Sequence, residues 1–145
     1  MIPNVLSIAG SDPSGGAGIQ ADIKAISANG AYAMAVLTAL TAQNTQGVSD
    51  IHVVPSAFVR SQIEAIFADI RVDAIKIGMI ATAEGAAAIA RSLSGQAGIP
   101  VVLDPVMIAK GGASLLQPDA VSALRDTLLP LATVLTPNLP EAAHL

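Results

Sequence analysis

Polar side chains late in the chain are of the types that metal and phosphate chemistry needs. Asp104 directly follows the apolar segment Val101–Leu103, and its carboxylate could hold Mg²⁺, which takes oxygen ligands. Asn138 and Glu141 stand three positions apart and could orient a metal-bound water. Each also has a simpler interpretation. Asp104 could form the turn before Pro105, and Asn138 with Glu141 could be a helix cap with its reciprocal glutamate.

A second group of side chains could recognise a small heterocyclic ligand. The Gln43 amide both donates and accepts hydrogen bonds, so it could pair with a ring edge, or it could be plain surface of a polar loop. Asp22 is either a ligand acceptor near a pocket or a solvated helix acid. Met79 could line a pocket with its thioether or fill the core. The segment Lys110-Gly111-Gly112 could be a mobile lid or a surface turn.

The segment 10–18 is rich in glycine and lies between an apolar run and a helical pattern. A strand, a glycine-rich turn and a helix start predict backbone N–H groups that face a ligand. The segment is not a P-loop, because Gly16 and Ala17 stand where lysine and serine or threonine are needed. Residues 16–21 fit G-x-G-x-x-A, but no acid follows in 37–41, which disfavours a dinucleotide site. The glycines could also serve only a tight turn and close helix packing.

These residues are spaced along a chain in which apolar segments alternate with helical patterns. We expect strands at 5–9, 32–40, 48–54, 74–80, 101–103 and 133–135, helices at 16–29, 56–70, 82–93 and 118–129, and a polar loop at 41–47. This alternation predicts an α/β fold, a three-layer αβα sandwich with a mostly parallel sheet. Ligands bind such sheets at the carboxyl ends of the strands, so we expect Gly10, Gln43, Asp104 and Asn138 at one edge.

Composition limits the classes of protein that fit. The chain has 145 residues, of which 52% are apolar and 12% charged, as expected for one domain with a large core. It has no cysteine, which excludes disulfides and zinc–thiolate sites. The net charge of −4 without a basic cluster argues against a nucleic-acid partner. No apolar run reaches the ~18 residues of a membrane span, and the N-terminus lacks a signal peptide's basic region, so we expect a cytoplasmic protein without a membrane partner.

Five segments together resemble the hydroxymethylpyrimidine kinase/phosphomethylpyrimidine kinase family of thiamine biosynthesis, within the ribokinase-like superfamily. They are AGSDPSGGAGIQADIK at 9–24, TALTAQNT at 38–45, KIGM at 76–79, VLDPVM at 102–107 and LTPNLPEA at 135–142. They follow the family's order and cover the whole chain. The resemblance implies ATP-dependent phosphorylation of 4-amino-5-hydroxymethyl-2-methylpyrimidine and then of its monophosphate, with ATP and Mg²⁺ as cofactors.

The resemblance also assigns roles to single positions. The residues that would contact the pyrimidine substrate are Gly10, Asp22, Gln43, Met79 and Val106. Asp104 and Glu141 match positions that help to place Mg²⁺, and Asn138 and Glu141 match positions that help to place the ATP phosphates. The family suggests a homodimer.

The resemblance places the catalytic base, the anion hole and most of the adenine pocket beyond Leu145. The helix that opens at Asn138 has room for about two turns, which is marginal at the end of a domain. We therefore expect residues 1–145 to be the N-terminal part of a single ribokinase-like kinase domain, incomplete at the C-terminus and inactive alone. Two alternatives stay open: a pyridoxal or pyridoxine kinase of the same superfamily, and a non-catalytic binding fragment.

Overall fold

A parallel five-stranded sheet forms the centre of the molecule. The computed structural model describes residues 1–109, 112 and 114–145. The strands are β1 (Asn4–Ala9), β2 (Tyr32–Leu37), β5 (Ala74–Ile77), β6 (Val101–Leu103) and β7 (Val134–Leu135), in the order β2-β1-β5-β6-β7. Each neighbouring pair is parallel. The predicted α/β class and parallel sheet are confirmed.

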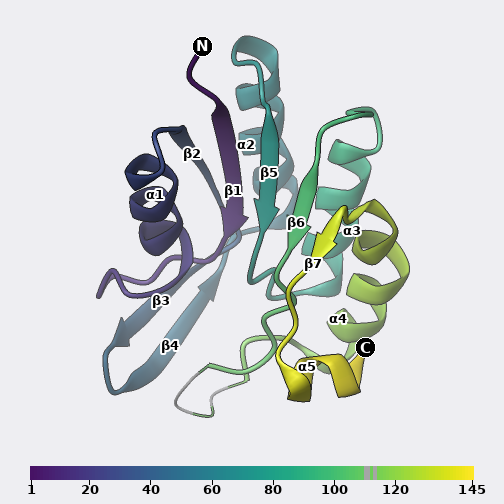
Figure 1. The fold of residues 1–145 in the computed structure, drawn as a ribbon. Helices are drawn as coiled ribbons and strands as arrows, with labels where there is room; N and C mark the ends of the chain where they lie inside the picture. Colours follow the sequence, from purple (N-terminus) through teal and green to yellow (C-terminus); the bar gives the residue numbers. More distant parts are fainter. Residues whose placement is uncertain (110–111, 113) are drawn as a thin grey trace.

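Helices cover both faces of this sheet (Figure 1). Leu6 and Ile8 of β1 pack in one core with Val59 of α2 (Ser56–Asp69) and Ile89 of α3 (Ala83–Leu93). The intervening Ser7 instead bonds to Asp22 of α1 (Gly18–Ala28). Because successive strand side chains point to opposite faces, α1 lies on the face opposite α2 and α3. This arrangement is the expected three-layer order.

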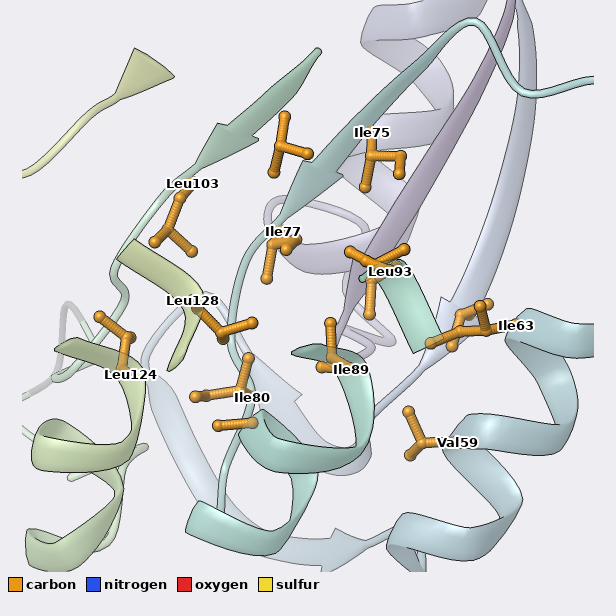
Figure 2. Packing of buried hydrophobic residues seen from close by; sticks show 14 of the residues in the cluster. Val59, Ile63, Ile75, Ile77, Ile80, Ile89, Leu93, Leu103, Leu124 and Leu128 are labelled. Atoms are coloured by element: carbon orange, nitrogen blue, oxygen red, sulfur yellow. The ribbon is translucent and has the colours of Figure 1, made fainter. Parts of the chain in front are cut away.

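The hydrophobic core lies between the sheet and the helices α2, α3 and α4 (Pro118–Ala123). Figure 2 shows how side chains from α2, α3 and the turn that follows α4, which carries Leu124 and Leu128, meet those of β5 and β6. Burying one such aliphatic side chain contributes about 1.5–3 kcal/mol. Members with no exposed surface include Leu6, Ile8, Ile77, Ile89, Leu103, Leu124 and Leu128. This core fixes the strand ends that carry the polar residues.

A two-stranded antiparallel ribbon projects beside the sheet, and it corrects the sequence prediction. It consists of β3 (Ala39–Asn44) and β4 (Gly47–Val53). The predicted loop at 41–47 is therefore wrong, and the strand expected at 32–40 ends at Leu37. The N–H of Thr38 still bonds to β1, but its buried hydroxyl donates to the Met79 carbonyl, and the ribbon starts at the next residue. The composition of β3 is that of a polar loop, but its side chains alternate between more buried and more exposed positions, as in a strand.

Other boundaries also differ from those expected. β5 ends at Ile77 and not at residue 80. The helix expected at 118–129 is α-helical only to Ala123; a π turn (Leu124–Leu128) and a 3-10 turn (Leu129–Leu131) follow, and Pro130 cannot continue an α-helix. Thr82 caps α3 as predicted, accepting from the Gly85 N–H at 3.0 Å. The last helix is α5 (Leu139–His144). No helix in the described part of the chain could span a membrane.

Candidate functional site

The glycine-rich loop between β1 and α1 is closed around its own carboxylate. Asp12 is 2% exposed. One carboxylate oxygen accepts from the N–H and hydroxyl of Ser14 at 2.8 and 2.7 Å, and the other accepts from the N–H groups of Gly16 and Ala17 at 3.0 and 2.8 Å. Burial alone would raise the pKa of Asp12, but these hydrogen bonds favour the ionised form and lower it. The prediction that the loop N–H groups face a ligand is wrong for these three, because Asp12 occupies them.

Gly18 fixes this loop against the end of β1. Its φ of +55° is the left-handed conformation, and a Cβ there would lie 2.3 Å from the Gly10 carbonyl oxygen. The same carbonyl accepts from the Ile19 N–H at 2.9 Å. Only glycine allows so close an approach in that conformation. The start of α1 and the end of β1 are therefore held as one unit.

Gly10 and Met79 meet at the carboxyl edge of the sheet, with Val106 packed nearby. A Cβ on Gly10 would lie 2.9 Å from the Met79 Cε. Met79 is 7% exposed, belongs to a small apolar cluster with Ala39 and Ala81, and has Val106 packed against that cluster. Met79 thus fills a small core and at the same time flanks Gly10. The interpretation that Met79 fills the core is confirmed, and its contact with a ligand stays a prediction.

Gln43 lies on β3 and is connected to the glycine-rich loop through a threonine. The Thr41 hydroxyl contacts the Ser11 carbonyl at 2.8 Å and the Gln43 Oε1 at 3.1 Å. The Ser11 N–H also donates to the Ala39 carbonyl at 2.9 Å. Gln43 lines an open hollow of about 560 Å³ between the ribbon and Pro13. The amide is therefore half-buried on a strand beside the loop.

Asp22 pairs with a half-buried lysine and a buried serine. Its carboxylate accepts from the Ser7 hydroxyl at 2.6 Å and lies 2.9 and 3.1 Å from the Lys76 Nζ. The side chain of Asp22 is 17% exposed, so the alternative of a solvated helix acid is wrong. The carboxylate lies under α1, against β1 and β5.

Asp104 follows β6 and is half-buried. Burial raises the pKa of its carboxyl above the ordinary value; the Lys76 charge lowers the pKa, and the charges of Glu141 and Asp22 raise it. Among the described residues, the Asp104 carboxyl is therefore acted on by two carboxylates, those of Glu141 and Asp22, and by the Lys76 ammonium. Such an excess of negative charge favours a bound cation.

Asn138 and Glu141 form a capping box at the start of α5. The Asn138 side chain accepts from the Glu141 N–H at 2.8 Å, and the Glu141 carboxylate accepts from the Asn138 N–H at 3.0 Å. The interpretation as a helix cap is confirmed. Both residues also line an apolar cavity of about 470 Å³ with Met107 and Leu116. The segment 110–112, for which the sequence left a lid or a surface turn open, falls mostly on Lys110 and Gly111, which lie outside the described residues.

The structure thus brings the predicted residues together in two groups. Gly10, Met79 and Val106 form one, with Gln43 attached through Thr41. The other group comprises Asp104, Asn138 and Glu141: Asn138 is bonded to Glu141, and the charge of Glu141 acts on Asp104. Asp22 is linked to this second group through its charge, which also acts on Asp104. Among the residues that the structure describes, no three His, Cys, Asp or Glu side chains are placed to hold a metal ion.

Sequence reasoning missed Asp12 and Lys76. Asp12 precedes a turn, and an aspartate at such a position often accepts from N–H groups a few residues on. Lys76 stands between Ile75 and Ile77 in an apolar strand. A lone charge in a strand buried on both faces needs a partner, and that signal could have found it.

The sheet order, the flanking helices and the ribbon define a ribokinase-like kinase fold. A phosphomethylpyrimidine kinase from Clostridium difficile 630 aligns with 97% of this chain at 49% identity and a TM-score of 0.90. The family model described as phosphomethylpyrimidine kinase matches residues 12–145, and the chain belongs to that family.

Two other relatives extend the comparison. The hydroxymethylpyrimidine/phosphomethylpyrimidine kinase of Escherichia coli (strain K12) is 53% identical over 98% of this chain and 53% of its own length. A pyridoxal kinase from Staphylococcus aureus, in complex with AMP-PCP and pyridoxal, is 37% identical with a TM-score of 0.86 over the whole chain and 51% of its own. The C. difficile structure is covered to 61%. The chain therefore spans about half the length of these relatives.

Proposed function

We propose that the protein containing this chain uses ATP to phosphorylate 4-amino-5-hydroxymethyl-2-methylpyrimidine and then its monophosphate, in thiamine biosynthesis. The observation that carries the proposal is the meeting of Gly10, Met79 and Val106 at the carboxyl edge, with Gln43 beside them, in a chain of this family. Residues 1–145 are the N-terminal part of the kinase domain in this proposal.

The pyrimidine is bound on the side of the glycine-rich loop. The Gln43 amide can both donate to and accept from an aminopyrimidine edge, and the Asp22 carboxylate can accept from the amino group. The apolar surfaces of Met79 and Val106 suit the ring. Because Asp12 already binds three N–H groups of the loop, the loop serves this side by its shape and not as a phosphate site.

Asp104 and Glu141 would hold Mg²⁺, and Asn138 with Glu141 would help to place the ATP phosphates. The negative charges around Asp104 suit a cation, and Mg²⁺ commonly binds through one or two carboxylates together with substrate phosphates. Bound Mg²⁺ neutralises phosphate charge. The residues of this chain keep the carboxylates in place: the capping box fixes Glu141, and the end of β6 fixes Asp104.

The alternative substrate is pyridoxal, and the resemblance to the S. aureus pyridoxal kinase supports it. The alternative from a different class of function is a non-catalytic binding fragment. The resemblance places the groups that stabilise the transferring phosphoryl outside this segment, so residues 1–145 alone should be inactive. A cytoplasmic location and a homodimer stay predictions.

The test compares phosphorylation of the pyrimidine and of pyridoxal by the full-length protein with Mg²⁺ and ATP. We expect the pyrimidine to have the higher kcat/KM. A higher value for pyridoxal would overturn the choice of substrate. Residues 1–145, assayed beside it, should be slower by about 10²-fold or more, because several transition-state contacts are missing. Equal rates would mean that the chain contains its own anion hole.

A further inference from the structure

Lys76 is a half-buried lysine in an otherwise apolar strand. Its neighbours Ile75 and Ile77 are 1% and 0% exposed and point into the core. Lys76 therefore points to the opposite face of β5, where α1 lies. Its side chain is only 25% exposed. Lysines are rarely this buried without a partner.

The partner is Asp22, which is fixed from two strands. Lys76 contacts both of its carboxylate oxygens, and the Ser7 hydroxyl of β1 donates to one of them. Ser7 is itself 0% exposed. A carboxylate with donors on two neighbouring strands keeps one orientation, because any rotation breaks a charge-assisted hydrogen bond.

Gly78 makes room for the lysine. A Cβ on Gly78 would lie 2.8 Å from the Lys76 Nζ and 3.0 Å from the Ala9 Cβ. The ammonium therefore lies over the Gly78 backbone, at the end of β5. From there its charge also acts on Asp104. One cation thus faces the carboxylates of both sides of the site.

We propose that Lys76 is a positioning residue that fixes the Asp22 carboxylate for substrate recognition, with Gly78 leaving the space it needs. The inference rests on the proposed function, in which Asp22 binds the pyrimidine. Without the ammonium, Asp22 keeps only the Ser7 hydroxyl and turns toward solvent. Lys76 then acts through Asp22 and touches no substrate.

The experiment measures KM and kcat of the full-length protein for the pyrimidine and for ATP. Lys76→Met should raise the KM for the pyrimidine by about 10- to 100-fold, the range for a lost hydrogen bond to a charged group. Gly78→Ala keeps the charge but displaces the ammonium, and its φ is not in the left-handed region. Gly78→Ala should also raise the KM for the pyrimidine, so the inference can be tested even if Lys76→Met does not fold. Arg60→Met, which removes an exposed cation paired with Glu64, is the matched control and should change neither KM.

A double-mutant cycle separates positioning from general destabilisation. On an Asp22→Asn background, Lys76→Met should add less than about 2-fold to the KM, because coupled residues are not additive. Two outcomes would overturn the inference, provided that the wild type phosphorylates the pyrimidine. One is that the effects of Asp22→Asn and Lys76→Met on the KM multiply fully, and the other is that neither Lys76→Met nor Gly78→Ala changes the KM for the pyrimidine. Absence of that wild-type activity would overturn the proposed function, and this inference with it.

Discussion

The two sides of the candidate site are held by contacts of different range. On the substrate side, which comprises Gly10, Asp22, Gln43, Met79 and Val106, the bonds join distant parts of the chain, such as Ser11 with Thr41 and Asp22 with Lys76. On the phosphate side, which comprises Asp104, Asn138 and Glu141, the capping box joins Asn138 and Glu141, three positions apart, while Asp104 is held by its N–H bond to the Ile77 carbonyl. Changes to the substrate side should therefore lower the stability of the whole fold. The capping box of Asn138 and Glu141 should tolerate change without global unfolding.

The largest expected loss of stability comes from a substitution in the turn that joins β1 to α1. Gly18→Ala places a Cβ 2.3 Å from the Gly10 carbonyl oxygen in a left-handed conformation. Because the neighbouring atom is backbone and cannot move aside, we expect a loss of about 4 kcal/mol or more in the free energy of unfolding. Urea unfolding of the variant measures it.

Gly30→Ala is the control, because it places an alanine in a left-handed conformation without a steric clash. Gly30 also has a positive φ, of +80°, but no atom lies within 4 Å of the added Cβ. Its cost should be only about 1–2 kcal/mol. Equal losses in the two variants would show that the close approach at Gly18 does not hold the substrate side together.

The next effect is on the carboxylate inside the loop. Asp12→Asn replaces an acceptor of four hydrogen bonds by an amide whose NH₂ opposes N–H donors. We expect a loss of about 3 kcal/mol at neutral pH. Ser14→Ala removes one donor alone and should cost about 1 kcal/mol.

The pH dependence of this loss follows from the lowered pKa of Asp12. A group whose pKa is lower in the folded protein stabilises it above the unfolded pKa, near about 3.9, and loses that stabilisation as the pH falls through the folded pKa. The difference between wild type and Asp12→Asn should therefore narrow below about pH 4. A difference that is constant down to pH 2 would contradict the assigned hydrogen bonds.

The helices and strands could be predicted from the sequence where the hydrophobic pattern is strong. The contacts between polar side chains could not be predicted. The core strands and the helix at 56–69 follow from apolar periodicity, and the caps Thr82 and Asn138 follow from residue type. The ribbon was missed because β3 places the polar Thr41 and Gln43 on its half-buried face and leaves Leu40 exposed, which is not the apolar-in, polar-out pattern expected of a strand. The pairing of Lys76 with Asp22 joins residues 54 positions apart, which no local pattern encodes.

A smaller effect tests the substrate side directly. Gln43→Ala in the full-length protein should weaken use of the pyrimidine by about 1–3 kcal/mol, because a half-buried hydrogen-bond partner is lost. The KM for ATP should stay unchanged, since Gln43 lies on the ribbon and not beside Asp104. The kcat/KM for the pyrimidine measures the effect. An unchanged value would remove Gln43 from the contact residues.

The smallest effect distinguishes a helix cap from a phosphate-side residue. Asn138→Ala and Thr82→Ala remove comparable caps, each a side chain that accepts from an N–H at the start of its helix. Both should lower the free energy of unfolding by about 1 kcal/mol. Thr82 has no place in the site, so only Asn138→Ala should also raise the KM for Mg²⁺–ATP. The backbone N–H that donates to the Glu141 carboxylate stays, but the side-chain oxygen that accepts from the Glu141 N–H and holds the first turn of α5 is lost. Equal stability losses with no change in that KM would leave Asn138 and Glu141 as a cap alone, and the phosphate side would then rest on Asp104.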